Sequence, residues 1–190
     1  DLTIVIRGAD ATSSTAAQLN AINNATALAV DLTNVTGLAG STLADLGTLA
    51  TAITNNQFSN DTGITTIAVT DTTIDASTLL TRIDSYDTIN GVGQTTDMTL
   101  ASGATINLDA SEITDMLADE TANRLTISDQ AITVTGAITV DNSNLLAAVT
   151  SGKLTATIAT TETVTELATL SADGGTNDLT IVIRGADATS

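Results

Sequence analysis

The chain has 190 residues, 40 of them threonine, and a formal net charge of −17 at pH 7. It contains no histidine, cysteine, tryptophan or proline, which excludes imidazole and thiolate catalysis, the common zinc and haem ligands, and disulfides. The negative charge and scarce aromatic side chains disfavour nucleic acid as a partner, and no apolar run approaches the ~18 residues of a membrane span. We therefore expect no enzyme, no nucleic-acid partner and no membrane span.

Both ends of the sequence carry one segment, DLTIVIRGADATS, at residues 1–13 and 178–190. So long an identity does not arise by chance. We therefore interpret residues 1–177 as one period of a tandem repeat and residues 178–190 as the start of the next. A duplicated end introduced by engineering or circularisation is the alternative. The chain begins directly in a strand-like run without a signal peptide, as expected of a mature protein or an internal fragment.

Strands are predicted where β-branched and apolar residues alternate with threonine or other small residues. In chain order these runs cover residues 2–6, 64–69, 125–127, 132–134 and 154–158. Their alternation predicts strands with one buried face, and the absence of proline suits continuous ladders.

Helices are predicted between these strands. Segments 73–83, 107–117 and 139–149 share an Asp, a small residue and a Ser, with apolar residues four and eight positions after the Asp. This spacing predicts an apolar helical stripe, and Asp directly before a helix is typical of an N-cap. We therefore interpret Asp75, Asp109 and Asp141 as helix caps rather than catalytic residues. Looser helical stripes begin near residues 19, 43 and 164.

These recurring units indicate the fold class. Six helix starts in one period average about 29 residues each, and a recurring strand–turn–helix unit of that length is the signature of a solenoid. We expect a β or α/β solenoid with parallel strand ladders and short helices capped by Asp or Ser. The alternative is a string of all-β immunoglobulin-like sandwiches, which usually contain a buried aromatic anchor and no capped helices.

The strand followed by D-A-S-x-L, the threonine-rich alternation and the acidic, cysteine-free composition together resemble a known group of sequences. They resemble the repeat regions of giant secreted surface proteins of cyanobacteria and other aquatic bacteria. The resemblance covers most of the chain. It implies an extracellular structural, adhesive or motility-related role, with no catalytic residues to carry over.

A calcium site is one candidate for chemistry. Residues 171–179, SADGGTNDL, are similar to the glycine-rich calcium turn of β-rolls, although one glycine is missing and the aspartate comes one place early. We name Asp173, Asn177 and Asp178 as potential ligands and calcium as the one potential cofactor. A glycine-rich turn without metal is the simpler interpretation.

A second candidate is a set of carboxylates on one predicted helix, Glu112, Asp115, Asp119 and Glu120. Glycosidases use paired carboxylates, but these residues lie off the apolar stripe, and no aromatic side chains are available to hold a sugar. We interpret them as a solvated face. Arg7, one of few cations, is expected to point outward and to pair with an Asp of a neighbouring unit.

The sequence therefore favours a mechanical function. We expect a structural repeat unit of a long extracellular fibre or cell-surface protein, used for matrix, adhesion or surface coating. Its partners would be neighbouring repeats, joined end to end. The alternative is a calcium-dependent adhesin module that binds a surface or glycan. Contacts between repeats are expected at the apolar residues of the terminal segment and its copy: Leu2, Ile4, Ile6, Leu179, Ile181 and Ile183.

Overall fold

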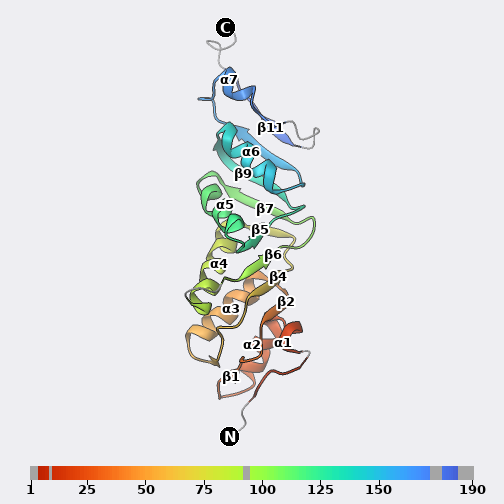
Figure 1. The fold of residues 1–190 in the computed structure, drawn as a ribbon, viewed down its shortest axis with the longest axis vertical. Coiled ribbons are helices and arrows are strands. Elements are labelled where there is room, and N and C mark those ends of the chain that lie inside the picture. Colours follow the sequence, from red (N-terminus) through yellow and green to blue (C-terminus); the bar gives the residue numbers. More distant parts are fainter. Residues whose placement is uncertain (1–3, 9, 92–94, 172–176, 184–190) are drawn as a thin grey trace. The chain divides into compact units, whose positions relative to one another are not determined.

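The computed structural model describes residues 4–8, 10–91, 95–171 and 177–183, whose elements are labelled in Figure 1. Within these residues the chain forms seven α-helices, one 3-10 helix and eleven strands, and every described strand pair is parallel. The protein is therefore an α/β protein with parallel sheets. This finding corrects the alternative of immunoglobulin-like sandwiches, because their sheets are antiparallel.

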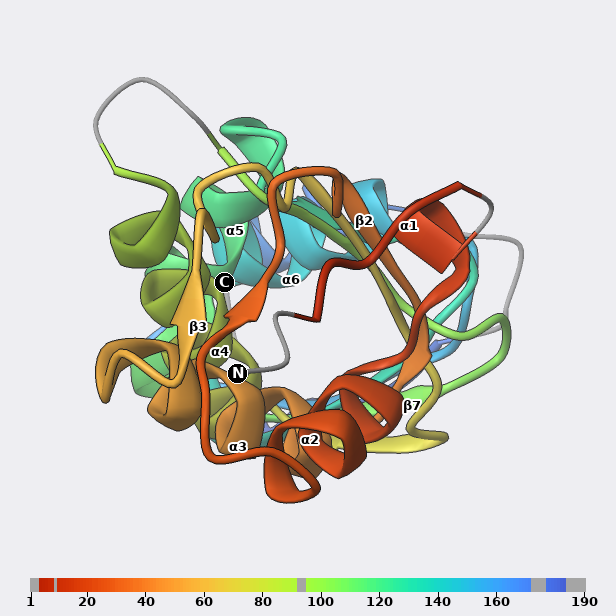
Figure 2. The ribbon, with the colours of Figure 1, turned by 90° about the horizontal axis from the view of Figure 1, so that it is seen from below.

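The chain divides into two compact units, and the first comprises Asp1–Asp71, Thr78–Ala101 and Asp119–Thr126. Its larger sheet has the strand order β2-β4-β6-β8, and β1 pairs with β3 in a two-stranded sheet. The strands are β1 (Val30–Asp31), β2 (Gly37–Ser41), β3 (Phe58–Ser59), β4 (Thr66–Val69), β6 (Asp97–Thr99) and β8 (Leu125–Thr126). The helices are α1 (Asp10–Ser13), α2 (Ala16–Asn24), α3 (Leu43–Thr54) and most of α4 (Ala76–Asn90). Helices α2 and α3 lie side by side (Figure 2).

The second unit comprises Thr72–Ser77, Ser102–Ala118 and Ile127–Ser190. Its single described sheet has the order β11-β10-β9-β7-β5. The strands are β5 (Thr73–Asp75), β7 (Thr105–Asp109), β9 (Ala131–Ile138), β10 (Leu154–Ile158) and β11 (Asp178–Thr180). The helices are η1 (Ala110–Glu112), most of α5 (Ile113–Thr121), α6 (Val140–Val149) and α7 (Val164–Leu167).

Paired strands recur at a limited range of sequence separations. The shortest separation is 20 residues, between Ala137 and Thr157, and the longest is 32, between Thr73 and Thr105. In the two larger sheets, one α-helix lies in the sequence between each strand and its next neighbour in the sheet. Each sheet thus grows by repetition of the same step along the chain.

The core of the first unit is mainly aliphatic and includes two buried aromatic residues, Phe58 and Tyr86. Leu46 and Leu49 of α3 and Ile83 and Tyr86 of α4 are fully buried. Their spacing of three residues gives each helix one apolar stripe. The Tyr86 hydroxyl donates a hydrogen bond to the carbonyl oxygen of Leu46 at 3.2 Å, and burial raises the pKa of the Tyr86 phenol. The one tyrosine of the sequence therefore joins α3 to α4.

The predicted helix caps have three different outcomes. Asp109 is the N-cap of η1, where its carboxylate accepts the backbone N–H of Ser111 at 2.9 Å. Asp75 ends β5 directly before α4. The prediction for Asp141 is wrong, because Thr139 is the N-cap of α6 and its hydroxyl accepts the N–H of Asn142. Strand β9 ends at Ile138, so the helix begins early enough to place Asp141 inside its first turn, where its charge still suits the dipole.

Candidate functional site

The N-terminal copy of the terminal segment pairs with strand β1 of the same unit. Val5 forms a parallel bridge with Asp31. The Asp31 N–H donates to the carbonyl oxygen of Ile4 at 2.9 Å, and the Ile6 N–H donates to the carbonyl oxygen of Asp31 at 3.2 Å. The side-chain amide of Asn34 also donates to the Ile6 carbonyl oxygen at 3.2 Å. Residues 4–6 are therefore held by two backbone hydrogen bonds to Asp31 and by one side-chain hydrogen bond from Asn34.

The carboxylate of Asp31 closes a turn beside these hydrogen bonds. Hydrogen bonds from the Thr33 hydroxyl and the Asn60 amide, with the charge of Arg7 adding to them, hold the pKa of Asp31 below its usual value. Arg7 is exposed. Its charge acts weakly on Asp31 of strand β1, but among the described residues no ion pair joins Arg7 to an Asp, so the predicted pairing is not observed.

The C-terminal copy pairs through its first three residues. Leu179 of β11 lies opposite Ala156 of β10 in parallel register. The side-chain oxygen of Asn177 accepts the N–H of Leu154 at 2.7 Å, and the carboxylate of Asp178 forms an exposed ion pair with Lys153 at 3.2 Å. The C-terminal copy is therefore held by the strand that precedes it.

Equivalent residues of the two copies differ in exposure. Ile6 is 7% exposed, whereas its copy Ile183 is 55% exposed. Ile4 is half-buried, whereas its copy Ile181 is 42% exposed. Leu2, the remaining member of the proposed contact, lies outside the described residues. The same apolar residues are thus packed where they meet Asp31 and exposed in the copy that follows β11.

The potential calcium ligands have other roles where they are described. Asp173 lies outside the described residues. The side-chain oxygen of Asn177 and the carboxylate of Asp178 bind Leu154 and Lys153, as given above. Across the described part of the chain, no group of three or more acidic, histidine or cysteine residues is arranged to hold a metal ion.

One carboxylate of the predicted acidic helix face is buried, which corrects the prediction that all four are solvated. Asp119 is 4% exposed and forms an ion pair with Arg124. Arg124 also binds the Asp87 carboxylate at 2.8 Å, and this hydrogen bond raises the pKa of the guanidinium. The other oxygen of Asp87 accepts the N–H of Thr96 at 3.2 Å. One arginine therefore joins the end of α4 to the end of α5 within the first unit.

The other acidic residues of that face are less buried than Asp119, and Glu120 among them is half-buried. Glu112 completes a capping box by accepting the N–H of Asp109, and Asp115 is exposed. Asp129 performs a similar local role, since the Ser102 hydroxyl and the Gly103 N–H bind its carboxylate and hold its pKa below the usual value. These carboxylates close turns and helix ends.

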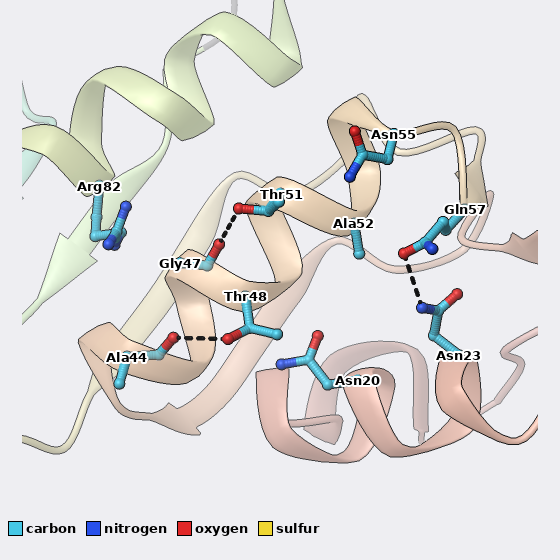
Figure 3. A pocket seen from close by; sticks show the side chains of 10 residues that line it. All are labelled: Asn20, Asn23, Ala44, Gly47, Thr48, Thr51, Ala52, Asn55, Gln57 and Arg82. Carbon is cyan, nitrogen blue, oxygen red and sulfur yellow. Dashed lines mark hydrogen bonds between the residues drawn. The ribbon is translucent and has the colours of Figure 1, made fainter.

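A polar groove of about 490 Å³ lies between α2 and α3, with Arg82 of α4 at its edge (Figure 3). The Asn20 amide donates to the Asp45 carbonyl oxygen at 3.0 Å, while its own side-chain oxygen is buried without a described partner. Arg82 crosses the α3 backbone and donates to the carbonyl oxygen of Leu43 at 3.2 Å. Most polar groups of the groove bind one another, and none is a nucleophile activated by a base.

The sequence did not reveal the Arg124 cluster or the Tyr86 contact. Both residues are rare in this chain, which has only five cations and one tyrosine. The scarcity of these residue types marked them as unusual, but their partners lie in distant segments and could not be named from the sequence.

Among the described residues, no helix has the length and apolar character needed to cross a membrane.

Comparison with protein-family models, with curated proteins and with solved structures found no match.

Proposed function

We propose that this chain is a structural repeat unit of a long extracellular fibre or cell-surface protein, and that it has no catalytic function. The observation that carries this proposal is the pairing of the terminal segment. Its first three residues bind the preceding strand β10 in one copy, and residues 4–6 bind the following strand β1 at Asp31 in the other copy. In a continuous array, one segment would make both sets of contacts. It would pair with the strand before it through its first three residues and with the strand after it through the next three.

We further propose that successive periods continue as one α/β solenoid. Three features support this finer architecture: all described strand pairs are parallel, paired strands are 20 to 32 residues apart, and one helix separates neighbouring strands of each larger sheet. Each turn of a solenoid is stabilised mainly by its neighbours, so additional periods extend the core without a new boundary.

The extracellular placement is supported by composition. Acidic and threonine-rich chains without cysteine suit a surface coat or matrix that must remain soluble and extended. One period, residues 1–177, contains 4 of the 5 cations and 20 of the 22 acidic residues. Stacked periods would therefore repel other fibres at low salt and approach one another when divalent ions screen the charge.

The test compares thermal unfolding of chains with one, two and three periods, each ending in residues 178–190. A continuous solenoid gains an interface with each period, so its Tm should rise with period number. The matched control replaces the internal copies of Ile6 by Asp, which should abolish the rise. A Tm that stays constant from one to three periods would show independent domains and overturn the proposal.

A further inference from the structure

We propose that separate chains join head to tail by segment exchange: Ile181–Ile183 of one chain replace Ile4–Ile6 of a second chain in parallel pairing with that chain's Asp31. The inference rests on the proposed function in taking a neighbouring repeat as the partner. It adds the surface that accepts the partner and the register in which the two chains pair. It also identifies the segment that competes for that surface, which is the second chain's own N-terminal segment.

The acceptor surface is defined by the contacts of the N-terminal copy. Asp31 offers its backbone N–H and carbonyl oxygen to residues on either side of Val5, and Asn34 offers its amide to the carbonyl oxygen of Ile6. The Ile6 side chain packs to 7% exposure. Any chain that presents the sequence Ile-Val-Ile in extended form satisfies the same groups.

The donor is the C-terminal copy of those residues. Ile181, Val182 and Ile183 are 42%, 53% and 55% exposed. They follow directly after β11, whose register with β10 anchors the preceding residues to their own chain. The donor can therefore bind a second chain while residues 178–180 remain in place.

The donor segment replaces an acceptor segment of identical sequence. Joined chains therefore grow into a linear assembly in one direction. The donor brings the same residues that the acceptor releases, so no backbone hydrogen bond is lost at the junction. The donor and acceptor surfaces are different parts of the molecule, so the contact is heterologous and each joined chain presents another free donor. The second chain's own segment is tethered beside Asp31, and this tether makes assembly dependent on concentration.

The first experiment uses the full chain and a matched pair of substitutions in identical sequence, Ile6→Asp and Ile183→Asp. Sedimentation velocity measures the concentration at which half of the chains are associated. Ile6→Asp weakens the competitor and should lower that concentration by about tenfold or more, whereas Ile183→Asp weakens the donor and should raise it by about tenfold or more, since each change removes one buried isoleucine contact. In the double variant the two shifts should largely cancel, so its association concentration should return close to that of the unmodified chain. Shifts in the same direction for both single variants would overturn the proposal.

The second experiment tests the register by disulfide trapping, for which the chain offers a background without cysteine. Mixing Val182→Cys with Asp31→Cys chains should give an oxidised dimer, because paired Cα atoms of neighbouring strands lie within disulfide reach. Val182→Cys mixed with Asp97→Cys is the matched control. Equal dimer yields in the two mixtures would contradict the stated register.

A locked chain separates the exchange from other association. Val5→Cys combined with Asp31→Cys should form an internal disulfide that holds the N-terminal segment in place, so the oxidised chain stays monomeric and the reduced chain associates. Association of the oxidised chain at the unmodified concentration would overturn segment exchange. If a three-period chain still gains Tm in that case, the proposed repeat function stands and only the exchange fails.

Discussion

Replacing Arg124 by Met should destabilise the first unit strongly. The substitution keeps much of the aliphatic length but removes the guanidinium from two carboxylates. The Asp119 side chain is 6% exposed and that of Asp87 is 19% exposed, while Arg124 itself is 28% exposed. Loss of one partner from a fully buried pair costs about 3–5 kcal/mol, whereas exposed pairs contribute about 0–1 kcal/mol. Because the arginine reaches solvent in part, we expect a loss of about 2–3 kcal/mol.

Urea unfolding at pH 7 measures this loss, and Lys153→Met is the matched control. Lys153 and Asp178 also form an ion pair, but their side chains are 52% and 65% exposed. The control should cost about 0.5 kcal/mol or less, and the cost should disappear in 1 M salt because exposed charges are screened. Arg124→Lys should be intermediate, since a lysine keeps the charge but cannot reach two carboxylates with a planar fork.

A loss below about 0.5 kcal/mol at pH 7, or one equal to that of Lys153→Met, would refute the reasoning that burial decides the strength of this pair.

Three further predictions test other parts of the structure. Thr139→Ala should cost about 1 kcal/mol in urea unfolding because it removes the α6 cap, while Asp141→Ala should cost only a few tenths, about 0.3 kcal/mol; the reverse order would restore Asp141 as the cap. The lowered pKa of Asp129 means that its stabilisation is present above the unfolded pKa of about 3.9 and is lost as the pH falls through the folded value. Asp129→Asn should therefore reduce the loss of unfolding free energy below pH 4. An unchanged pH dependence of the unfolding free energy between pH 6 and 2 would contradict this. Gly152→Ala places a Cβ 2.3 Å from a backbone oxygen and should cost roughly 1–3 kcal/mol, whereas Gly47→Ala meets only a flexible arginine end and should change the unfolding free energy by less than about 1 kcal/mol in either direction; equal costs would refute the backbone clash.

Local patterns in the sequence predicted many of the elements. The alternation over 154–158 corresponds to β10, and the stripe over 139–149 corresponds to α6. Residues 73–83 form a strand that runs directly into a helix, β5 and α4, as the Asp-x-Ser start indicated. These signals survive because strand alternation and helix capping depend on residues close together in sequence.

Pairing between distant segments was not predictable in the same way. Successive strands from β4 to β9 alternate between the two larger sheets, and no local pattern specifies that alternation. The two-residue strands β1 and β3 are too short to give a periodic signal. Asp119 looked like part of a solvated face because its burial depends on Arg124, which follows in the next turn.

For the terminal segment, the sequence predicted some features and missed others. Its duplication in the sequence is the basis of the tandem-repeat interpretation, and alternation placed Ile4 and Ile6 on one face. The sequence did not reveal that one half of the segment pairs backwards with β10 and the other half pairs forwards with Asp31. That division of contacts requires the strand register, which is set by neighbours more than 20 residues away.

The central claim is that periods join through this segment into one continuous stack, and electron microscopy of chains with one, two and three periods tests it most directly. Six strand spacings of ~4.8 Å add about 29 Å per period. We predict unbranched particles that lengthen by that constant increment at unchanged width, with no gap at the junctions. Particles that resemble separate beads with variable spacing, or that gain width instead of length, would contradict the claim.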